Sequence, residues 1–150
     1  MTRSKDIGTR AETQVVRFLA ANGWPSAERR ALHGLLDQGD VTGTPGLVWE
    51  VKGGEAAKCA SDKLISAWFD EAQVEARNAG ADYGFLVVQR RQKNERDWWA
   101  VIGVCDLASL IAKEPITYSS LHCRITLKQL VELLAGSGWT SGDTRTLEDQ

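Results

Sequence analysis

Two charged residues interrupt an otherwise apolar run in the segment GDVTGTPGLVWEVKGG, which covers residues 39–54. If this run is a β-strand, alternate residues share a face, so Glu50 and Lys52 point to one side. Trp49 and Val51 then point to the other side, where large apolar side chains suit a core. The charged pair therefore predicts a second, polar face that is available for chemistry.

A turn centred at Pro45 would place Asp40 opposite Glu50 and Val41 opposite Trp49. Directly opposed side chains have Cβ atoms about 4.5–5.5 Å apart. Two carboxylates so placed repel each other unless a cation lies between them or one is protonated. A register shifted by one residue would separate the acids, and the turn residues do not decide between the registers. Burying Val41 together with Trp49 favours the first register.

An acid pair with a lysine two residues further on suits metal-assisted hydrolysis of a phosphodiester. Carboxylates hold Mg²⁺, which keeps several waters and accepts a phosphate oxygen as a further ligand. The ion lowers the pKa of bound water, and lysine can orient that water, help deprotonate it or stabilise the transition-state charge. The alternative is a solvated strand face in which Glu50 and Lys52 form only a weak surface ion pair.

Asp40 and Glu50-Val51-Lys52 resemble the PD-(D/E)xK nuclease motif, in the form D-x9-E-x-K. The preceding segment, which runs from Gly8 through Glu12 into an apolar helix and Gly23-Trp24, is similar to the opening of archaeal-type (also phage-borne) Holliday-junction resolvases. Gly39 stands where the name of the motif has proline. The resemblance covers roughly residues 4–90.

The resemblance implies a restriction-endonuclease-like fold and an Mg²⁺-dependent DNA endonuclease, with Mn²⁺ as a substitute ion. The expected substrate is branched DNA such as a four-way junction, cut by a homodimer because two symmetric cuts need a two-fold pair of sites. Recombination or repair in the cytoplasm of a bacterial, archaeal or phage-infected cell fits such an enzyme. Two alternatives stay open: another nuclease of this superfamily (restriction-like, repair or flap-cutting), and a non-catalytic DNA-binding or assembly subunit of the same fold.

The resemblance also assigns roles to individual residues. The expected catalytic residues are Lys52, Glu50, Asp40 and Gln73. The expected metal ligands are Asp40, Glu50, Glu12 and the backbone carbonyl of Val51. The expected DNA contacts are Arg29, Arg30, Arg10 and Lys5.

Several of these residues have ordinary alternatives. Glu12 borders the apolar stripe of its helix and could be only a solvated glutamate. Gln73 could hydrogen-bond Arg77 one turn further on, and the two neighbouring arginines at 29–30 could be a solvated charge pair. Asp37 could replace Asp40 as the metal ligand. A loop histidine such as His33 is more often incidental than catalytic.

The elements that must position these residues follow from periodicity and capping. Apolar steps of three and four predict helices over 4–22 and 61–79, and apolar runs predict strands over 39–43, 47–52, 83–89 and 98–104. Asp106 is expected to cap a short helix, Thr126 to cap a last one ending near Ala135, and 90–97 to form a polar loop. This order is that of an α/β domain with one mixed central sheet flanked by helices, spanning 1–138 and followed by a disordered tail over 139–150.

Composition agrees with a soluble globular domain: the 150 residues are 43% hydrophobic and 25% charged, with a net charge of −2. No apolar run approaches the roughly 20 residues of a membrane span. Three cysteines without a CxxC pair favour reduced thiols over a disulfide framework or a zinc knuckle. Six basic residues against three acidic ones within 1–36 give the N-terminal segment a local excess of positive charge. Of the adjacent Trp98 and Trp99, only one can face the core.

Overall fold

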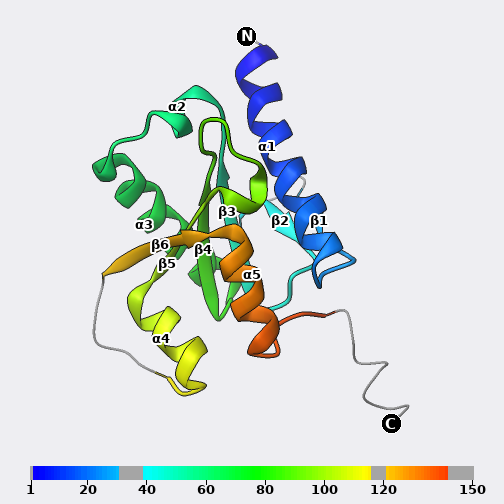
Figure 1. Ribbon diagram of the computed structural model, residues 1–150, viewed down its shortest axis with the longest axis vertical. Helices are drawn as coiled ribbons and strands as arrows, with labels where there is room; N and C mark the ends of the chain where they lie inside the picture. The colour runs from blue at the N-terminus through cyan, green and yellow to red at the C-terminus, as the bar shows by residue number, and fades with distance from the viewer. Residues whose placement is uncertain (1, 31–38, 116–120, 142–150) are drawn as a thin grey trace.

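A four-stranded mixed sheet forms the centre of the computed structural model, which describes residues 2–30, 39–115 and 121–141, with side chains from residue 6 onward (Figure 1). Its strands are β3 (Leu47–Lys52), β4 (Tyr83–Val88), β5 (Trp99–Gly103) and β6 (His122–Thr126), in that spatial order. β3 and β4 are parallel, whereas β4–β5 and β5–β6 are antiparallel. The chain is therefore an α/β protein with a mixed sheet, as the sequence predicts.

Helices cover both faces of this sheet. One face, which carries Trp49 and Phe85, packs against α1 (Thr2–Ala21), α4 (Val104–Ala112) and α5 (Leu127–Gly136). The other face packs against the short helix α2 (Gly54–Lys58) and the longer α3 (Asp62–Ala79), chiefly through Ile65 and Phe69. α2 and α3 connect β3 to β4, which is the crossover that two parallel strands require.

Local sequence signals explain the ends of the main helices. Ser61 accepts a hydrogen bond from the backbone of Leu64 and so caps α3, which ends at Gly80 in the left-handed conformation with φ of 64°. Thr126 caps α5 through a complete capping box with Gln129. The predicted helices over 4–22 and 61–79 and the last helix are confirmed within a few residues, as are the strands over 47–52, 83–89 and 98–104.

The predicted hairpin around Pro45 does not form a regular ladder in the described part of the chain. β2 (Val41–Thr42) pairs instead with β1 (Glu28–Arg29) in a separate two-stranded sheet. A single backbone hydrogen bond, from Asp40 N to Trp49 O at 2.8 Å, ties the segment before β2 to β3. The prediction was too regular because it did not foresee β1, whose residues Glu28 and Arg29 pair with Thr42 and Val41.

Four further details differ from the sequence-based predictions. Asp106 lies in the first turn of α4 and Gly103 occupies the N-cap, since the helix begins directly at the end of β5. The elements α2, β1 and β6 were not predicted, because each is too short or too polar to give a periodic signal. The polar loop over 90–97 contains one 3₁₀ turn, Glu95–Asp97.

The fourth difference concerns the predicted disordered tail. Trp139 packs on the ring of Tyr83 at 5.2 Å, and its carbonyl accepts a hydrogen bond from Trp24 Nε1 at 3.1 Å. Ser141 N donates to Gly23 O at 2.9 Å. An ordered anchor therefore extends at least to Ser141, because the Trp139 ring packs on Tyr83 and the backbone of this segment bonds to the residues that follow α1. The remainder of the tail lies outside the described residues.

None of the helices in the described ranges combines the length and the apolar character that crossing a membrane requires.

Candidate functional site

The side chains of β3 alternate between two environments, as predicted. Trp49 is fully buried between Trp24 and Phe85, and Val51 belongs to the same core beneath α1. Glu50 and Lys52 point to the opposite face, toward α3. Because β3 is the outer strand of the four-stranded sheet, its charged face lies next to the edge of that sheet.

Asp40 lies at that edge. Its carboxylate oxygen Oδ2 accepts a hydrogen bond from Val51 N at 2.7 Å, and its own backbone N donates to Trp49 O. The N–H and C=O of one strand residue point in the same direction, so the Val51 carbonyl also faces the side occupied by Asp40. The edge thus gathers one carboxylate and one backbone carbonyl, both of which the sequence nominated as metal ligands.

The carboxyl group of Asp40 is strongly perturbed. Burial, and after it repulsion from Glu50, raises the pKa of Asp40 from 3.8 to about 8. The hydrogen bond from Val51 and the positive charge of Lys52 lower this pKa, and repulsion from Glu12 raises it further. The predicted proximity of Asp40 and Glu50 is therefore present, although a regular hairpin ladder does not produce it.

Glu50 is a buried carboxylate with one satisfied oxygen. Only 7% of the residue is exposed, and its Oε1 lies 3.2 Å from Lys52 Nζ. Its second oxygen, Oε2, is buried and has no hydrogen-bond partner among the described residues. Because a buried carboxylate oxygen without a partner costs free energy, it marks a position where a ligand atom or a cation would be stabilising.

Lys52 lies between two carboxylates. Its Nζ is 3.2 Å from Glu50 Oε1 and 3.7 Å from Glu71 Oε2, and it lies 5.6 Å from the ring centre of Trp68 on α3. Burial opposes the charge of this ammonium, but the attraction of Glu50, Glu71 and Asp40 outweighs it and raises the pKa of Lys52. In this arrangement Lys52 is a cation that donates hydrogen bonds and is not poised as a free base.

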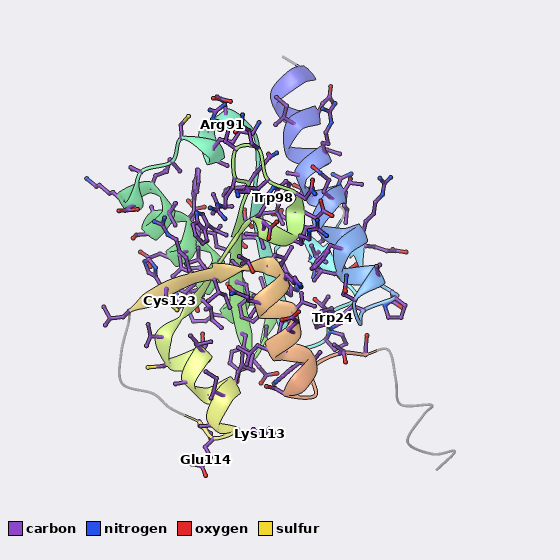
Figure 2. The ribbon with its side chains drawn as sticks, in the orientation of Figure 1. Trp24, Arg91, Trp98, Lys113, Glu114 and Cys123 are labelled. Carbon is purple, nitrogen blue, oxygen red and sulfur yellow. The ribbon has the colours of Figure 1, made fainter. Side chains whose placement is uncertain are left out.

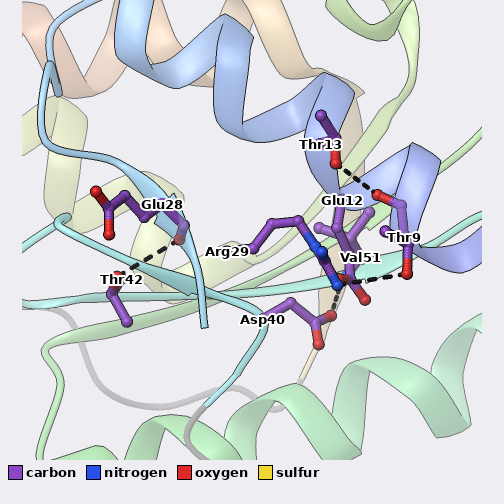
Figure 3. Close-up of polar contacts among 8 residues, drawn as sticks. All are labelled: Thr9, Glu12, Thr13, Glu28, Arg29, Asp40, Thr42 and Val51. Carbon is purple, nitrogen blue, oxygen red and sulfur yellow. Dashed lines mark hydrogen bonds and ion pairs between the residues drawn. The ribbon is translucent and has the colours of Figure 1, made fainter. Parts of the chain in front are cut away.

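Helix α1 brings Glu12 to the same edge. Arg29 Nε donates to Glu12 Oε2 at 2.9 Å, and Arg29 Nη2 lies 3.4 Å from the hydroxyl of Thr9. In Figure 3 the side chains of Glu12, Arg29 and Asp40 point toward one another between α1 and β3. The helix can approach closely because a side chain at Gly53, the residue after Lys52, would collide with Ala11. Glu12 therefore lies next to the acid pair, and its carboxylate is paired with Arg29.

The donor set allows a test of whether a divalent cation fits here. A hard cation would supply a partner for the buried Glu50 oxygen and would stabilise the charged form of Asp40, whose pKa is raised. It could also accept the outward Val51 carbonyl as a ligand. Two carboxylates and a carbonyl match Mg²⁺, which keeps several waters. Within the described ranges, no three His, Cys, Asp or Glu residues are grouped closely enough to hold a metal ion. Glu12 would have to leave Arg29 to become a direct third ligand.

Gln73 lies at a different level of the sheet from Lys52. Its amide nitrogen donates to Gly84 O at 2.9 Å, and Gly84 pairs with Val48 across β3 and β4. The α3 residue that reaches Lys52 is Glu71, which the sequence analysis did not nominate. Its spacing of three residues from Trp68 puts both on one helical face, and that spacing is the signal that could have identified it.

The predicted basic DNA contacts are dispersed. Arg29 pairs with Glu12, and Arg30 is half-buried, with its backbone N bound to Asp40 O at 2.8 Å. Arg10 is exposed on α1, on the same helix as Glu12. The side chain of Lys5, like the alternatives His33 and Asp37, lies outside the described residues.

The adjacent tryptophans divide as predicted. Trp98 (Figure 2) is fully buried and donates from Nε1 to Lys93 O at 3.0 Å. Trp99 packs instead against the second core, which includes Ile65 and Phe69 of α3. The guanidinium of Arg90 covers the Trp99 ring at 3.9 Å from its centre. The outer tryptophan is therefore already stacked against an arginine.

Comparisons with known proteins return no match to this chain from any family model, curated protein or solved structure. The fold itself defines the class: an α/β protein whose mixed four-stranded sheet is flanked by helices.

Proposed function

We propose that this protein is a metal-dependent DNA endonuclease of the PD-(D/E)xK type. The observation that carries the proposal is the convergence of Asp40 with Glu50 and Lys52 at the outer strand of the sheet, with a buried Glu50 oxygen that has no hydrogen-bond partner among the described residues. Structural ion pairs do not need an orphaned carboxylate oxygen beside a carboxyl group whose pKa is raised to about 8. A carboxyl group whose pKa is raised by burial and by a neighbouring carboxylate is typical of functional sites.

In the proposed site, Asp40, Glu50 and the Val51 carbonyl hold Mg²⁺, or Mn²⁺ as its substitute. When bound, the ion supplies a water of lowered pKa and neutralises charge on the phosphate. Lys52, a cation held by Glu50 and Glu71, orients the attacking water and stabilises charge that develops on the phosphate oxygens. Glu12 supports the ion through water, or directly once Arg29 turns to the DNA. The motif assigns Gln73 the role of placing the attacking water. Because the Gln73 amide is bonded to Gly84 O and Glu71 contacts Lys52, Glu71 is the α3 residue that lies better for this role.

The finer proposal is a structure-selective Holliday-junction resolvase that acts as a homodimer. Its support is the sequence resemblance of the first helix together with the position of Glu12 beside the acid pair. Another nuclease of the superfamily, cutting duplex, damaged or flapped DNA, uses the same site chemistry. Symmetric, dimer-dependent cutting of a four-way junction separates these two assignments.

A second candidate is a non-catalytic DNA-binding or assembly subunit of the same fold. It is favoured by one observation: over the described part of the chain, no group of three metal-ligating side chains is close enough to hold an ion. The pairing of Glu12 with Arg29 and of Lys52 with two glutamates also fits a purely structural role.

The test offers the protein a four-way junction, a linear duplex, a flap and a single strand, each with Mg²⁺, with Mn²⁺ and with a chelator. We expect metal-dependent cleavage, strongest on the junction, and no cleavage by Asp40→Asn. Cleavage of duplex or flap in preference to the junction would select the alternative nuclease. Binding of DNA by a folded protein that cleaves none of the four would select the non-catalytic subunit.

A further inference from the structure

A positively charged hollow lies at the carboxyl end of β4, beside the candidate site. It has a volume of about 270 Å³, and Val88 and Trp99 form part of its wall. Its basic lining residues come from α2, the loop after β4, and β6: Lys58, Arg90, Arg91 and Arg124. We name it the Arg90 hollow. None of these four residues was among the DNA contacts expected from the sequence.

Contacts with the protein hold the arginines in place. Arg90 stacks on Trp99 and donates from Nη1 to Asp97 O at 2.8 Å, which uses one of its five donors. Arg124 Nη2 lies 2.5 Å from Asp62 Oδ1. Arg90 keeps both of its contacts when an anion binds, so it loses little conformational freedom on binding.

The charges of the Arg90 hollow are not balanced. Among the described residues, four cationic side chains line it, and two acidic partners, Glu55 with Arg91 and Asp62 with Arg124, offset them. Both acids are on the exposed rim: 67% of the Glu55 side chain and 92% of the Asp62 side chain are accessible. Water screens such exposed pairs strongly, so an entering anion can replace the acids. Two positive charges remain in excess.

The position of the hollow connects it to the candidate site. Gln89, part of its lining, donates from its backbone N to Lys52 O at 2.9 Å, and Val88 pairs with Lys52 across the two parallel strands. Lys58 and Gln89 also line a second hollow of about 270 Å³ that contains Arg10 of α1. Basic residues thus follow the ends of β3 and β4 from α1 to β6.

We infer that the Arg90 hollow binds backbone phosphates of the nucleic-acid strand whose phosphodiester lies at Lys52. Fixed guanidinium groups match phosphate oxygens in geometry as well as in charge. The two excess charges correspond to two neighbouring phosphates. The identity of the anion as DNA rests on the proposed function, whereas the hollow and its charges do not.

The test measures DNA binding in a chelator, so that no cleavage occurs, at a series of salt concentrations. Each phosphate neutralised by the protein contributes about 0.9 to the slope of log affinity against log salt. We expect the double variant Lys58→Gln with Arg91→Gln, which removes two positive charges, to reduce that slope by about two units and to weaken binding. Lys113→Gln removes a charge at the opposite end of the molecule and should leave the slope unchanged (Figure 2).

A second variant gives an effect of the opposite sign. Glu55→Gln releases Arg91 from its rim partner and should tighten binding at least about threefold. Glu114→Gln, which removes an acid at the far end, serves as its control (Figure 2). Both expected changes in the hollow variants, with both controls unchanged, support the inference; circular dichroism checks that each variant is folded.

The inference is overturned if the double variant and Lys113→Gln show the same slope and affinity, or if the folded wild-type protein binds no DNA. Wild-type cleavage, assayed separately with Mg²⁺, reports on the proposed function. If the wild-type protein cleaves DNA but the hollow variants bind DNA as the wild type does, only the inference about the hollow is rejected. Salt-dependent binding that the hollow variants weaken, with no cleavage, supports the hollow and rejects the nuclease proposal.

Discussion

The two faces of β3 place residues of opposite character within one strand. Toward α1, Trp49 is fully buried, donates from Nε1 to Thr44 Oγ1 at 3.2 Å and packs on two aromatic rings. Toward α3, Glu50 is almost as buried yet keeps one oxygen without a partner among the described residues. The first face stabilises the folded state, whereas the buried Glu50 oxygen on the second face lowers its stability. Burial alone therefore does not distinguish core from site; the satisfaction of polar groups does.

The largest expected effect is on the charged face. Asp40→Asn, Glu50→Gln and Lys52→Ala should each reduce metal-dependent DNA cleavage by at least about 10³-fold, because each removes a metal ligand or the cation beside the phosphate. Urea unfolding should remain cooperative in all three variants. Full cleavage by Glu50→Gln and Lys52→Ala would falsify the assignment of the site.

The apolar face should respond in the opposite way. Trp49→Ala should lower the free energy of unfolding by about 3–5 kcal/mol, since it empties a fully buried aromatic site. Trp49→Phe keeps most of the packing and should cost less. Urea denaturation measures both. A Trp49→Ala protein as stable as Glu50→Gln would remove the contrast between the faces.

Glu12 tests whether the charged region extends to α1. Glu12→Gln should lower the cleavage rate by on the order of 10²-fold at limiting metal, and added Mn²⁺ should restore part of the loss because the defect lies in metal support. Glu132→Gln, which removes an exposed acid paired with Lys128 on α5, is the matched control and should keep the rate and the metal dependence of the wild type. A wild-type rate for Glu12→Gln would confine the site to Asp40 and β3.

The acid pair should also be visible in the pH dependence of stability without metal. Asp40 has a pKa of about 8 in the folded protein and an ordinary value of 3.8. The folded state therefore binds a proton that the unfolded state has lost, so stability declines as the pH rises from about 4 to about 8. Asp40→Asn should remove this decline while keeping an acceptor for Val51 N. Urea midpoints in a chelator at several pH values, compared between the two proteins, isolate the contribution of Asp40.

The smallest expected effect separates Gln73 from Glu71. Gln73→Ala leaves Gly84 O without its donor and should cost about 1 kcal/mol of stability, with less than about a threefold change in cleavage rate. Glu71→Gln loosens Lys52 and should change the rate more. Parallel rate measurements decide the order. A loss of about 10²-fold in Gln73→Ala would return Gln73 to the catalytic role that the motif assigns to it.

Much of the contrast on β3 could be predicted from the sequence alone. A period of two places Trp49 and Val51 apart from Glu50 and Lys52 whatever the strand pairs with. Apolar steps and caps, such as Thr126 with Gln129, likewise determine where the helices begin and end. These signals depend on neighbours within a few residues, so local geometry suffices to interpret them.

Only the tertiary structure decided which distant side chains meet. The way the helices cross the sheet determines three features. It pairs Glu12 with Arg29, and it places Glu71 instead of Gln73 beside Lys52. It also forms the basic hollow between α2 and β6. In place of the regular hairpin, β2 pairs with β1, a partner that local turn residues cannot reveal. Packing angles and edge pairing are set by contacts between segments far apart in the chain, and no spacing within a single segment records them.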